Sequence, residues 1–164
     1  MKSSLLMDFS VEKENSTVKV KREFAAPVEK VWAAWTQSEL LDQWWAPKPW
    51  KARTKSMDFS VGGFWLYAMV GPDGSEQFAR ADYKSINPMK NFKWLDAFCD
   101  QEGIVNTEFP RSKWSVSFTG SGDSTFVDVE IKHEKLADLE MIIEMGFKEG
   151  FTAALENLDE LLDK

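Results

Sequence analysis

The strongest constraint on the fold is an alternation of apolar and polar residues that begins near Lys51 and continues for about eighty residues. A period of two places successive side chains on opposite faces of a strand, so each segment has one face that can be buried. Gly, Pro, Asn and Asp separate the segments and favour tight turns, most clearly in the sequence GPDG at 71–74. We expect an antiparallel meander of six strands, at 52–60, 63–70, 75–86, 91–100, 112–119 and 124–133.

The residues before the meander predict one more strand and two short helices. Residues 17–26 alternate as a strand does. Pro27 follows, and proline is well tolerated in the first turn of a helix, which we expect over 28–35. Ser38 is a suitable N-cap for a second helix, which must end before Pro47.

The second helix ends in the sequence LLDQWWAPKPW, where aromatic residues and prolines crowd together. We interpret this stretch as the hinge between the helix and the meander. Trp44 and Trp45 are neighbours, so on a helix their side chains point about 100° apart. We expect Trp45 to face the mouth of a pocket and Trp44 to pack on the neighbouring helix.

The C-terminal residues, from about 137 to 164, have apolar residues at helical spacing and predict one long helix. Gly146 and Gly150 lie four residues apart, which would place them on one face of that helix. They indicate either the close approach of another surface or space left for a ligand. The order of strand, two short helices, meander and terminal helix predicts an α+β fold, in which the sheet curls around the terminal helix.

Composition argues against several classes of partner. The 164 residues include 27 acidic and 20 basic residues, for a net charge of −7. Nucleic acids and anionic membranes attract basic surfaces, so we expect neither as a partner. The one cysteine, Cys99, cannot form an internal disulfide, and we interpret it as an inert thiol. No apolar run resembles a signal peptide or a membrane span, so we expect a cytoplasmic protein.

Few residues suggest catalysis. The one histidine, His133, ends a predicted strand among charged neighbours, and we interpret it as a solvated strand end. Without a second histidine, or a cysteine at ligand spacing, we predict no metal site. No motif predicts a cofactor or a catalytic triad, which makes an enzyme the less favoured interpretation.

Large rings dominate the apolar residues, with eight Trp and twelve Phe but only two Tyr. In three of the predicted strands the rings recur at period two, so one face of the sheet should be covered with them. Two interpretations remain open: the rings fill the core against the terminal helix, or they line a cavity.

Five stretches of the sequence resemble, in order, the family of homologues of the activator of the heat-shock protein 90 ATPase. They are REFAAPVEKVWAAWT, LLDQWWAP, MDFSVGGFWLYAMVGPDG, ADYKSINP and GFKEGFTAALENLDELL. The family belongs to the SRPBCC (START-like) superfamily, and the resemblance implies its helix-grip fold, the fold of the birch-pollen allergens. That fold is a curved antiparallel sheet of six to seven strands around a long C-terminal helix, with an apolar pocket between them. We assign the domain to residues 17–164 and an N-terminal extension to residues 1–16.

The implied pocket has two polar candidates. Asp96 shares one strand face with three large rings. If that face points inward, burial should raise the pKa of Asp96, whereas a bulge would place it in water. Arg80 and Asp82 are the second candidate, as an ion pair across the same pocket. We predict that Arg80 or Asp96 anchors the ligand and that its apolar part contacts Trp35, Trp45, Trp65, Tyr67, Phe92, Trp94, Phe98, Trp114 and Met145.

The function that we expect is non-catalytic binding of a small hydrophobic or aromatic molecule in this pocket. The first alternative is a co-chaperone-like or stress-response interaction module. Eukaryotic co-chaperones of the family have a second, N-terminal domain for which this chain has no room, so a chaperone partner is less favoured. The second alternative is an enzyme for aromatic or polyketide-like substrates. A homodimer also remains open, because Phe64, Leu66 and Phe126 would form an outer apolar face if they were contiguous.

Overall fold

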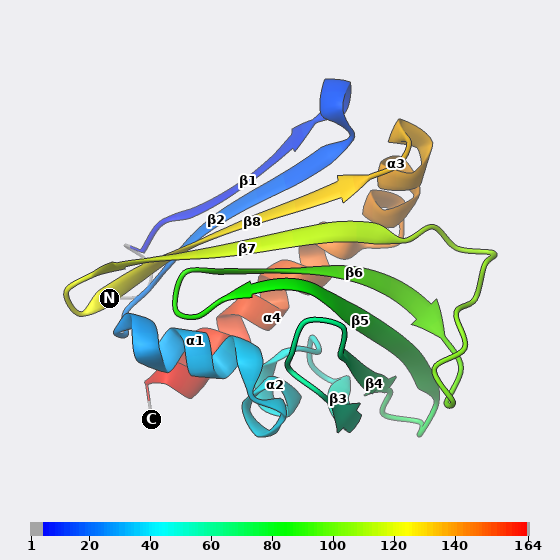
Figure 1. Cartoon of the computed structure of the whole chain (residues 1–164), viewed down its shortest axis with the longest axis horizontal. Coiled ribbons are helices and arrows are strands. Elements are labelled where there is room, and N and C mark those ends of the chain that lie inside the picture. The colour runs from blue at the N-terminus through cyan, green and yellow to red at the C-terminus, as the bar shows by residue number, and fades with distance from the viewer. Residues whose placement is uncertain (1–4, 164) are drawn as a thin grey trace.

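The computed structural model describes residues 5–163 as one antiparallel sheet with helices against its inner face (Figure 1). The eight strands stand in the order β1-β2-β8-β7-β6-β5-β4-β3. They are β1 (Met7–Glu12), β2 (Thr17–Phe24), β3 (Lys51–Met57), β4 (Phe64–Val70), β5 (Glu76–Asn87), β6 (Asn91–Cys99), β7 (Ser112–Ser121) and β8 (Ser124–His133). The helices are α1 (Val28–Thr36), α2 (Ser38–Trp44), α3 (Leu136–Glu144) and α4 (Phe147–Leu162), with a short 3-10 helix, η2 (Lys13–Asn15). The predicted α+β helix-grip fold is confirmed.

The meander expected from the alternation is present as β3 to β8, close to the predicted bounds. Neighbouring strands pair antiparallel throughout, and β8 continues the sheet onto β2. The alternation therefore identified the strands correctly, because one face of each strand packs against the core and most of the strands carry polar residues on the other face. Strand β4 is the exception, since its sequence FWLYAMV is apolar on both faces.

The sheet has one strand more than the largest number predicted. This strand, β1, comes from residues 7–12, within the predicted N-terminal extension, and it pairs with β2. Met7 and Phe9 pack against the core from this strand. Residues 1–4 of the predicted extension lie outside the described residues.

The helices enclose the inner face of the curved sheet. Helix α4 runs behind the sheet in Figure 1, while α1 and α2 lie toward one end. Helix α1 contacts β7, β8 and α4, and α2 contacts β3 and α4. Helix α3 packs on β8 and on η2, at the far end. The space between sheet and α4 is therefore bounded by α2 on one side and α3 on the other.

The prediction of one long C-terminal helix is wrong in one respect, because the helix is broken at Met145–Gly146. Gly146 has φ +93°, a left-handed conformation that glycine adopts readily and that ends a helix. Gly146 and Gly150 therefore do not share a helix face. Met145 is displaced into solvent at the break, with 57% of its surface exposed.

Tryptophan and phenylalanine rings form the centre of the core. Trp35, Trp65, Phe92 and Trp94 are at most 2% exposed. Most of the ring pairs meet edge to face or tilted, the arrangement that the charge distribution of aromatic rings favours. For these four rings, filling of the core is the interpretation that the structure supports.

The two adjacent tryptophans at the end of α2 separate as predicted. Trp44 is fully buried, and its Nε1 donates a 2.9 Å hydrogen bond to the carbonyl oxygen of Ala34 on α1. Trp45 instead lies over the inner face of the sheet, where its Nε1 donates a 3.0 Å hydrogen bond to the hydroxyl of Tyr67 on β4. The hinge thus fixes α2 to α1 through one ring and to the sheet through the other.

A buried ion pair attaches α4 to strand β2. Arg22 of β2 and Asp159 of α4 are 6% and 9% exposed, and the guanidinium Nη2 donates to the carboxylate of Asp159. Because charges are costly to bury unpaired, this contact fixes the position of α4 across β2.

Candidate functional site

A cavity of about 240 Å³ lies between the inner face of the sheet and the two C-terminal helices. Rings form much of its wall: Trp45, Tyr67, Phe98, Trp114, Phe147 and Phe151. Aliphatic side chains, among them Met69, Ile131 and Ile142, complete the apolar part. Both helices that meet at the break contribute to the lining, α3 through Ile142 and α4 through Phe147. The structure thus combines a ring-filled core with a cavity beside it, and Trp45, Tyr67, Trp114 and Phe151 belong to both.

Five of the eleven predicted site residues line this cavity: Trp45, Tyr67, Asp96, Phe98 and Trp114. Four others, Trp35, Trp65, Phe92 and Trp94, are packed in the core instead. Their inward orientation was predicted correctly, but other rings pack over those of the sheet. Trp32 of α1 packs on Phe92, and Trp45, at the end of α2, packs on Trp65 and Trp94. Met145 lies on the surface at the helix break.

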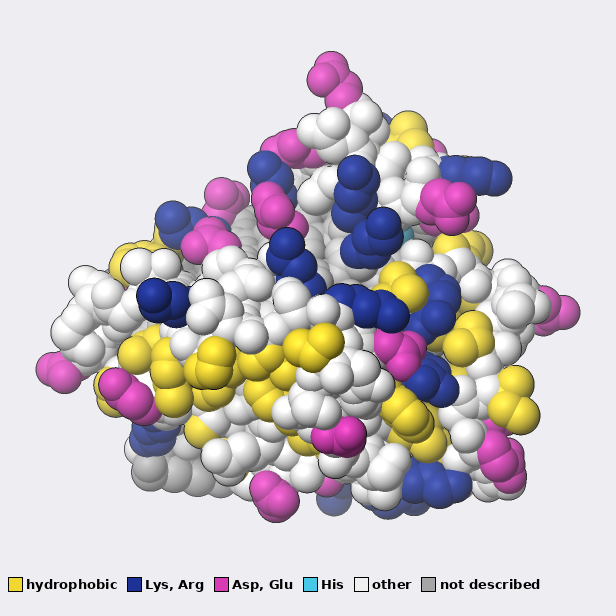
Figure 2. Space-filling view, in the orientation of Figure 1, with side chains coloured by type: hydrophobic (Ala, Val, Ile, Leu, Met, Phe, Trp, Pro, Cys, Tyr) yellow, Lys and Arg dark blue, Asp and Glu magenta, His cyan; other side chains and the backbone are white. Residues whose placement is uncertain are grey.

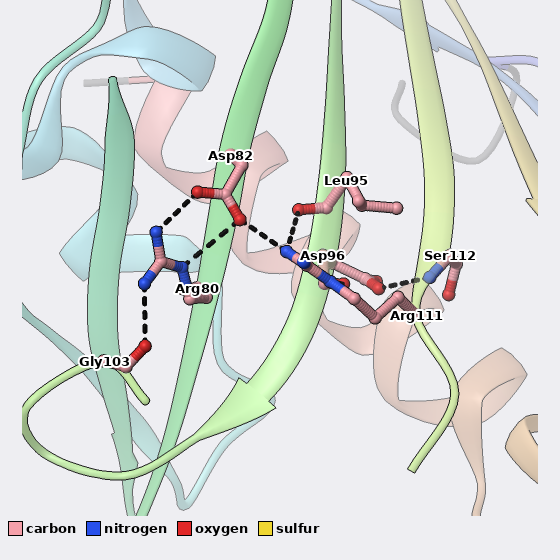
Figure 3. A network of polar contacts seen from close by, with 7 residues as sticks. All are labelled: Arg80, Asp82, Leu95, Asp96, Gly103, Arg111 and Ser112. Carbon is pink, nitrogen blue, oxygen red and sulfur yellow. Dashed lines mark hydrogen bonds and ion pairs between the residues drawn. The ribbon is translucent and has the colours of Figure 1, made fainter. Parts of the chain in front are cut away.

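Arg80, the remaining predicted residue, lies on the outer face of the sheet. The predicted pair with Asp82 forms, through Arg80 Nε at 3.2 Å and Nη2 at 2.6 Å, but not across the cavity. The two residues alternate with Ala79 and Ala81, which face inward, so the sheet separates the pair from the cavity. Arg80 Nη1 also donates to the carbonyl oxygen of Gly103 (Figure 3).

Asp82 forms a second ion pair with Arg111, whose Nη2 donates to the carboxylate (Figure 3). Burial opposes ionisation of Asp82, but the hydrogen bonds from Arg80 and Arg111 prevail and lower its pKa. Arg111 Nε also donates to the backbone carbonyl of Asp96 at 3.0 Å. This network fixes the loop between β6 and β7 against the outer face of the sheet.

The outer apolar residues that favoured a homodimer do not form one open patch. Leu66 is 4% exposed, and Gly103 of the β6–β7 loop packs over it. The Arg80 guanidinium lies 3.9 Å from the centre of the Phe64 ring. Lys21 lies over the ring of Phe126, 5.6 Å from its centre.

Much of the remaining outer face is basic, as the dark-blue side chains over the sheet in Figure 2 show. Five lysines surround a shallow depression there: Lys19, Lys84, Lys93, Lys113 and Lys132. This depression therefore differs in chemistry from the ring-lined cavity on the inner face.

Asp96 lies on the inner face of β6, on the cavity wall, as the alternation predicts. One carboxylate oxygen accepts a 2.7 Å hydrogen bond from the backbone N–H of Ser112, and the other accepts a 2.7 Å hydrogen bond from Nε1 of Trp114. Burial raises the pKa of Asp96, while the contacts with Ser112 and Trp114 oppose the shift by stabilising the ionised form.

The pairing of β6 with β7 ends beside Asp96. Leu95 and Lys113 form the last paired positions, and beyond them the two strands diverge. The side chain of Asp96 bridges the gap by accepting the N–H of Ser112, which no longer has a ladder partner on β6. The cavity therefore has a polar end, located where the sheet opens.

His133 was not predicted to belong to the site, yet it lines the cavity and is only 2% exposed. The interpretation as a solvated strand end is wrong, because His133 continues the inward series of Val127, Val129 and Ile131 on β8. Its Nδ1 is buried with no hydrogen-bond partner among residues 5–163. Burial lowers the pKa of His133, and the nearby carboxylate of Asp138 opposes this shift.

Ser112 was also missed from the sequence. It is buried, it lines the cavity, and it pairs across strands with His133. The signal that was available for both residues is the phase of the alternation, which places them on the same face as Trp114 and Ile131. Both residues are polar, so the apolar pattern of their strands does not single them out.

Other kinds of site find no support in the part of the chain that the structure describes. Between residues 5 and 163, no three His, Cys, Asp or Glu side chains are grouped so that they could hold a metal ion. Cys99 is a free, half-buried thiol whose pKa is raised by burial. None of the described helices is both long enough and apolar enough to cross a membrane.

A curved antiparallel sheet, a C-terminal helix across its inner face and a cavity between them define a helix-grip domain of the SRPBCC type. The sequence model for activator of Hsp90 ATPase homolog 1-like proteins matches residues 25–163. The chain belongs to this family, as its resemblance predicted.

Solved structures of similar proteins show the same arrangement. Protein Ms6760 from Mycobacterium smegmatis is 27% identical, with 96% of each chain covered and a TM-score of 0.88. A protein from Arthrobacter aurescens is 28% identical, with 95% of this chain and 91% of that chain covered and a TM-score of 0.90. A Nitrosomonas europaea protein is 26% identical, with 91% and 95% covered and a TM-score of 0.80. A comparison with curated proteins found no match.

Proposed function

We propose that the protein binds a small, predominantly apolar molecule with an aromatic ring in the cavity between the sheet and α4. The observation that carries this proposal is the combination of a ring-lined wall with two polar side chains, Asp96 and His133, at one end. Small-molecule sites are typically concave, mostly apolar and supplied with a few polar groups.

The size of the cavity restricts the ligand. At about 240 Å³ it is smaller than the roughly 300–1,000 Å³ of typical ligand pockets, so it suits a molecule of one or two rings. Burying about 300 Å² of apolar ligand surface at ~25 cal/mol per Å² gives a gross gain of roughly 7 kcal/mol. Association costs reduce this gain, so we expect affinities no tighter than micromolar.

We propose binding and not catalysis because Asp96, Ser112 and His133 are not arranged as a catalytic triad. In a Ser-His-Asp triad the histidine lies between the other two and relays the proton. Here Ser112 lies between Asp96 and His133, because it pairs with His133 on one side and donates its N–H to Asp96 on the other. His133 is thus not oriented by the carboxylate, and we propose no reaction.

The test is a titration with naphthalene-sized apolar probes, followed by the melting temperature and by tryptophan fluorescence. Trp45 and Trp114 line the cavity, so binding should change their emission. Ala79→Leu should block binding, because Ala79 lines the cavity and three added carbons would fill part of it. The matched control is Ala153→Leu, on the half-buried side of α4. Failure of every probe to bind, or equal binding by the Ala79→Leu protein, would contradict the proposal.

A further inference from the structure

Three polar side chains form a row across the inner face of the sheet, at one end of the cavity. Asp96, Ser112 and His133 come from the adjacent strands β6, β7 and β8. Ser112 pairs in register with His133 and donates its backbone N–H to Asp96. Neighbouring strands lie about 4.8 Å apart, so the carboxyl and the imidazole face the cavity from either side of a small serine.

Asp96 and His133 differ in how fully their polar atoms are hydrogen-bonded. Each oxygen of Asp96 already accepts one hydrogen bond, from Ser112 and from Trp114. The imidazole of His133 is nearly inaccessible to solvent, and its Nδ1 has no partner among the described residues. Buried polar atoms are almost always hydrogen-bonded, so an unpartnered one on a cavity wall indicates that something in the cavity is its partner.

The chemistry of the row selects the kind of group that it can receive. A neutral imidazole has one nitrogen that donates and one that accepts, and a carboxyl group accepts when ionised and can donate when protonated. A hydroxyl both donates and accepts, so it suits the row in either state of Asp96 and either tautomer of His133. A carboxylate on the ligand would face the buried carboxyl of Asp96, which like-charge repulsion and desolvation disfavour.

We infer that the ligand is an aromatic compound with a hydroxyl group, such as a phenol. Its ring lies among Trp45, Trp114 and Phe147, and its hydroxyl hydrogen-bonds to the row at His133 and Asp96. This inference rests on the proposed function and names the class of ligand for the same cavity. Buried hydrogen bonds set orientation and selectivity, so the row should distinguish molecules that differ only in this hydroxyl.

The experiment compares 2-naphthol with 2-methylnaphthalene, which has nearly the same shape but no hydroxyl. Affinities are measured by NMR chemical-shift titration of the wild type, of His133→Phe and of the control Phe98→Leu. The wild type should bind 2-naphthol about fivefold to tenfold more tightly, the effect of roughly one net hydrogen bond. In His133→Phe the preference should fall to about onefold to twofold. Phe98 lines the cavity but has no polar side-chain atom that could hydrogen-bond to a hydroxyl, so Phe98→Leu should weaken both probes in parallel and keep their ratio.

The wild type alone provides a second readout, in case His133→Phe does not fold. His133 is the one histidine in the sequence, so its ring resonances can be followed without ambiguity. 2-Naphthol should shift them more than 2-methylnaphthalene does. Equal affinity of the two probes for the wild type would overturn the inference and leave the proposed function intact. Failure of both probes to bind would remove the proposed function together with the inference.

Discussion

Trp114 of β7 donates its indole N–H to the carboxylate of Asp96 on β6, over 2.7 Å, at the position where the two strands diverge. A ring that helps to form the apolar wall of the cavity thus also holds the polar group at its end. Core packing and the shape of the site depend on the same residue.

Replacing this ring tests that link. Trp114→Phe should lower the free energy of unfolding by about 1–3 kcal/mol, because a buried carboxyl oxygen loses its donor. The pKa of Asp96 should rise further, since the indole stabilises the ionised form. Urea unfolding and carboxyl ¹³C NMR measure the two effects. Trp50→Phe, at a half-buried ring, is the control and should leave the pKa of Asp96 unchanged.

Stability should also depend on the protonation of His133. Its pKa is lowered in the folded protein, so its contribution to stability is present above the ordinary pKa of about 6.5 and is lost as the pH falls through the folded value. Asp96 acts in the opposite sense, because its raised pKa favours the folded state at low pH. The wild type should therefore lose more stability than His133→Phe between pH 7 and pH 5, in otherwise parallel urea titrations.

The ring protons of the one histidine report its pKa directly by NMR. A value at or above about 6.5 in the folded protein would contradict the burial of His133 on the cavity wall.

The buried pair of Arg22 and Asp159 allows a comparison between neighbouring residues. Asp159→Ala leaves the Arg22 guanidinium buried without this carboxylate and should cost about 3–5 kcal/mol. The next residue, Glu160, pairs with Lys48 at 2.9 Å on the surface. Glu160→Ala should change stability by less than about 1 kcal/mol. Thermal or urea unfolding measures the loss of stability in both variants. Similar losses would contradict the role of the buried pair as an anchor of α4.

The two glycines near the helix break should respond with opposite signs. Gly146→Ala forces an alanine into φ +93° and should destabilise the protein by about 1–3 kcal/mol. Gly150 lies inside α4, where an added Cβ would meet Pro47 at an ordinary 3.8 Å. Gly150→Ala should therefore stabilise the protein by up to about 1 kcal/mol through helix propensity. Destabilisation by both substitutions would contradict the break and favour one continuous helix.

The fold was predictable because the alternation of the meander strands and the motifs of the family agree. The break at Gly146 was not, since a glycine within an apolar helical pattern is compatible with a continuous helix until its conformation is known. Strand β1 could have been found, because Met7, Phe9 and Val11 alternate with polar residues, but a short edge strand of six residues gives a weak signal.

The site was predictable only in part, for a different reason. Alternation shows which side chains face inward, but it cannot show which of them α1 and α2 then cover. Trp65 and Tyr67 share one face of β4, yet of the two only Tyr67 lines the cavity. His133 was misjudged because charged neighbours along the chain suggested solvent, whereas α3 packs over the end of β8.

The most direct test of the account is an ¹H–¹⁵N NMR titration with 2-naphthol, following the indole N–H signals assigned by single Trp→Phe variants. The signals of Trp45 and Trp114 should shift in a saturable manner, together with the ring of His133, because all three residues line the cavity. The signal of Trp44 should change much less, since its N–H is bonded to Ala34 between the helices. The absence of saturable shifts at Trp45, Trp114 and His133 would contradict the assignment of this cavity as a ligand site.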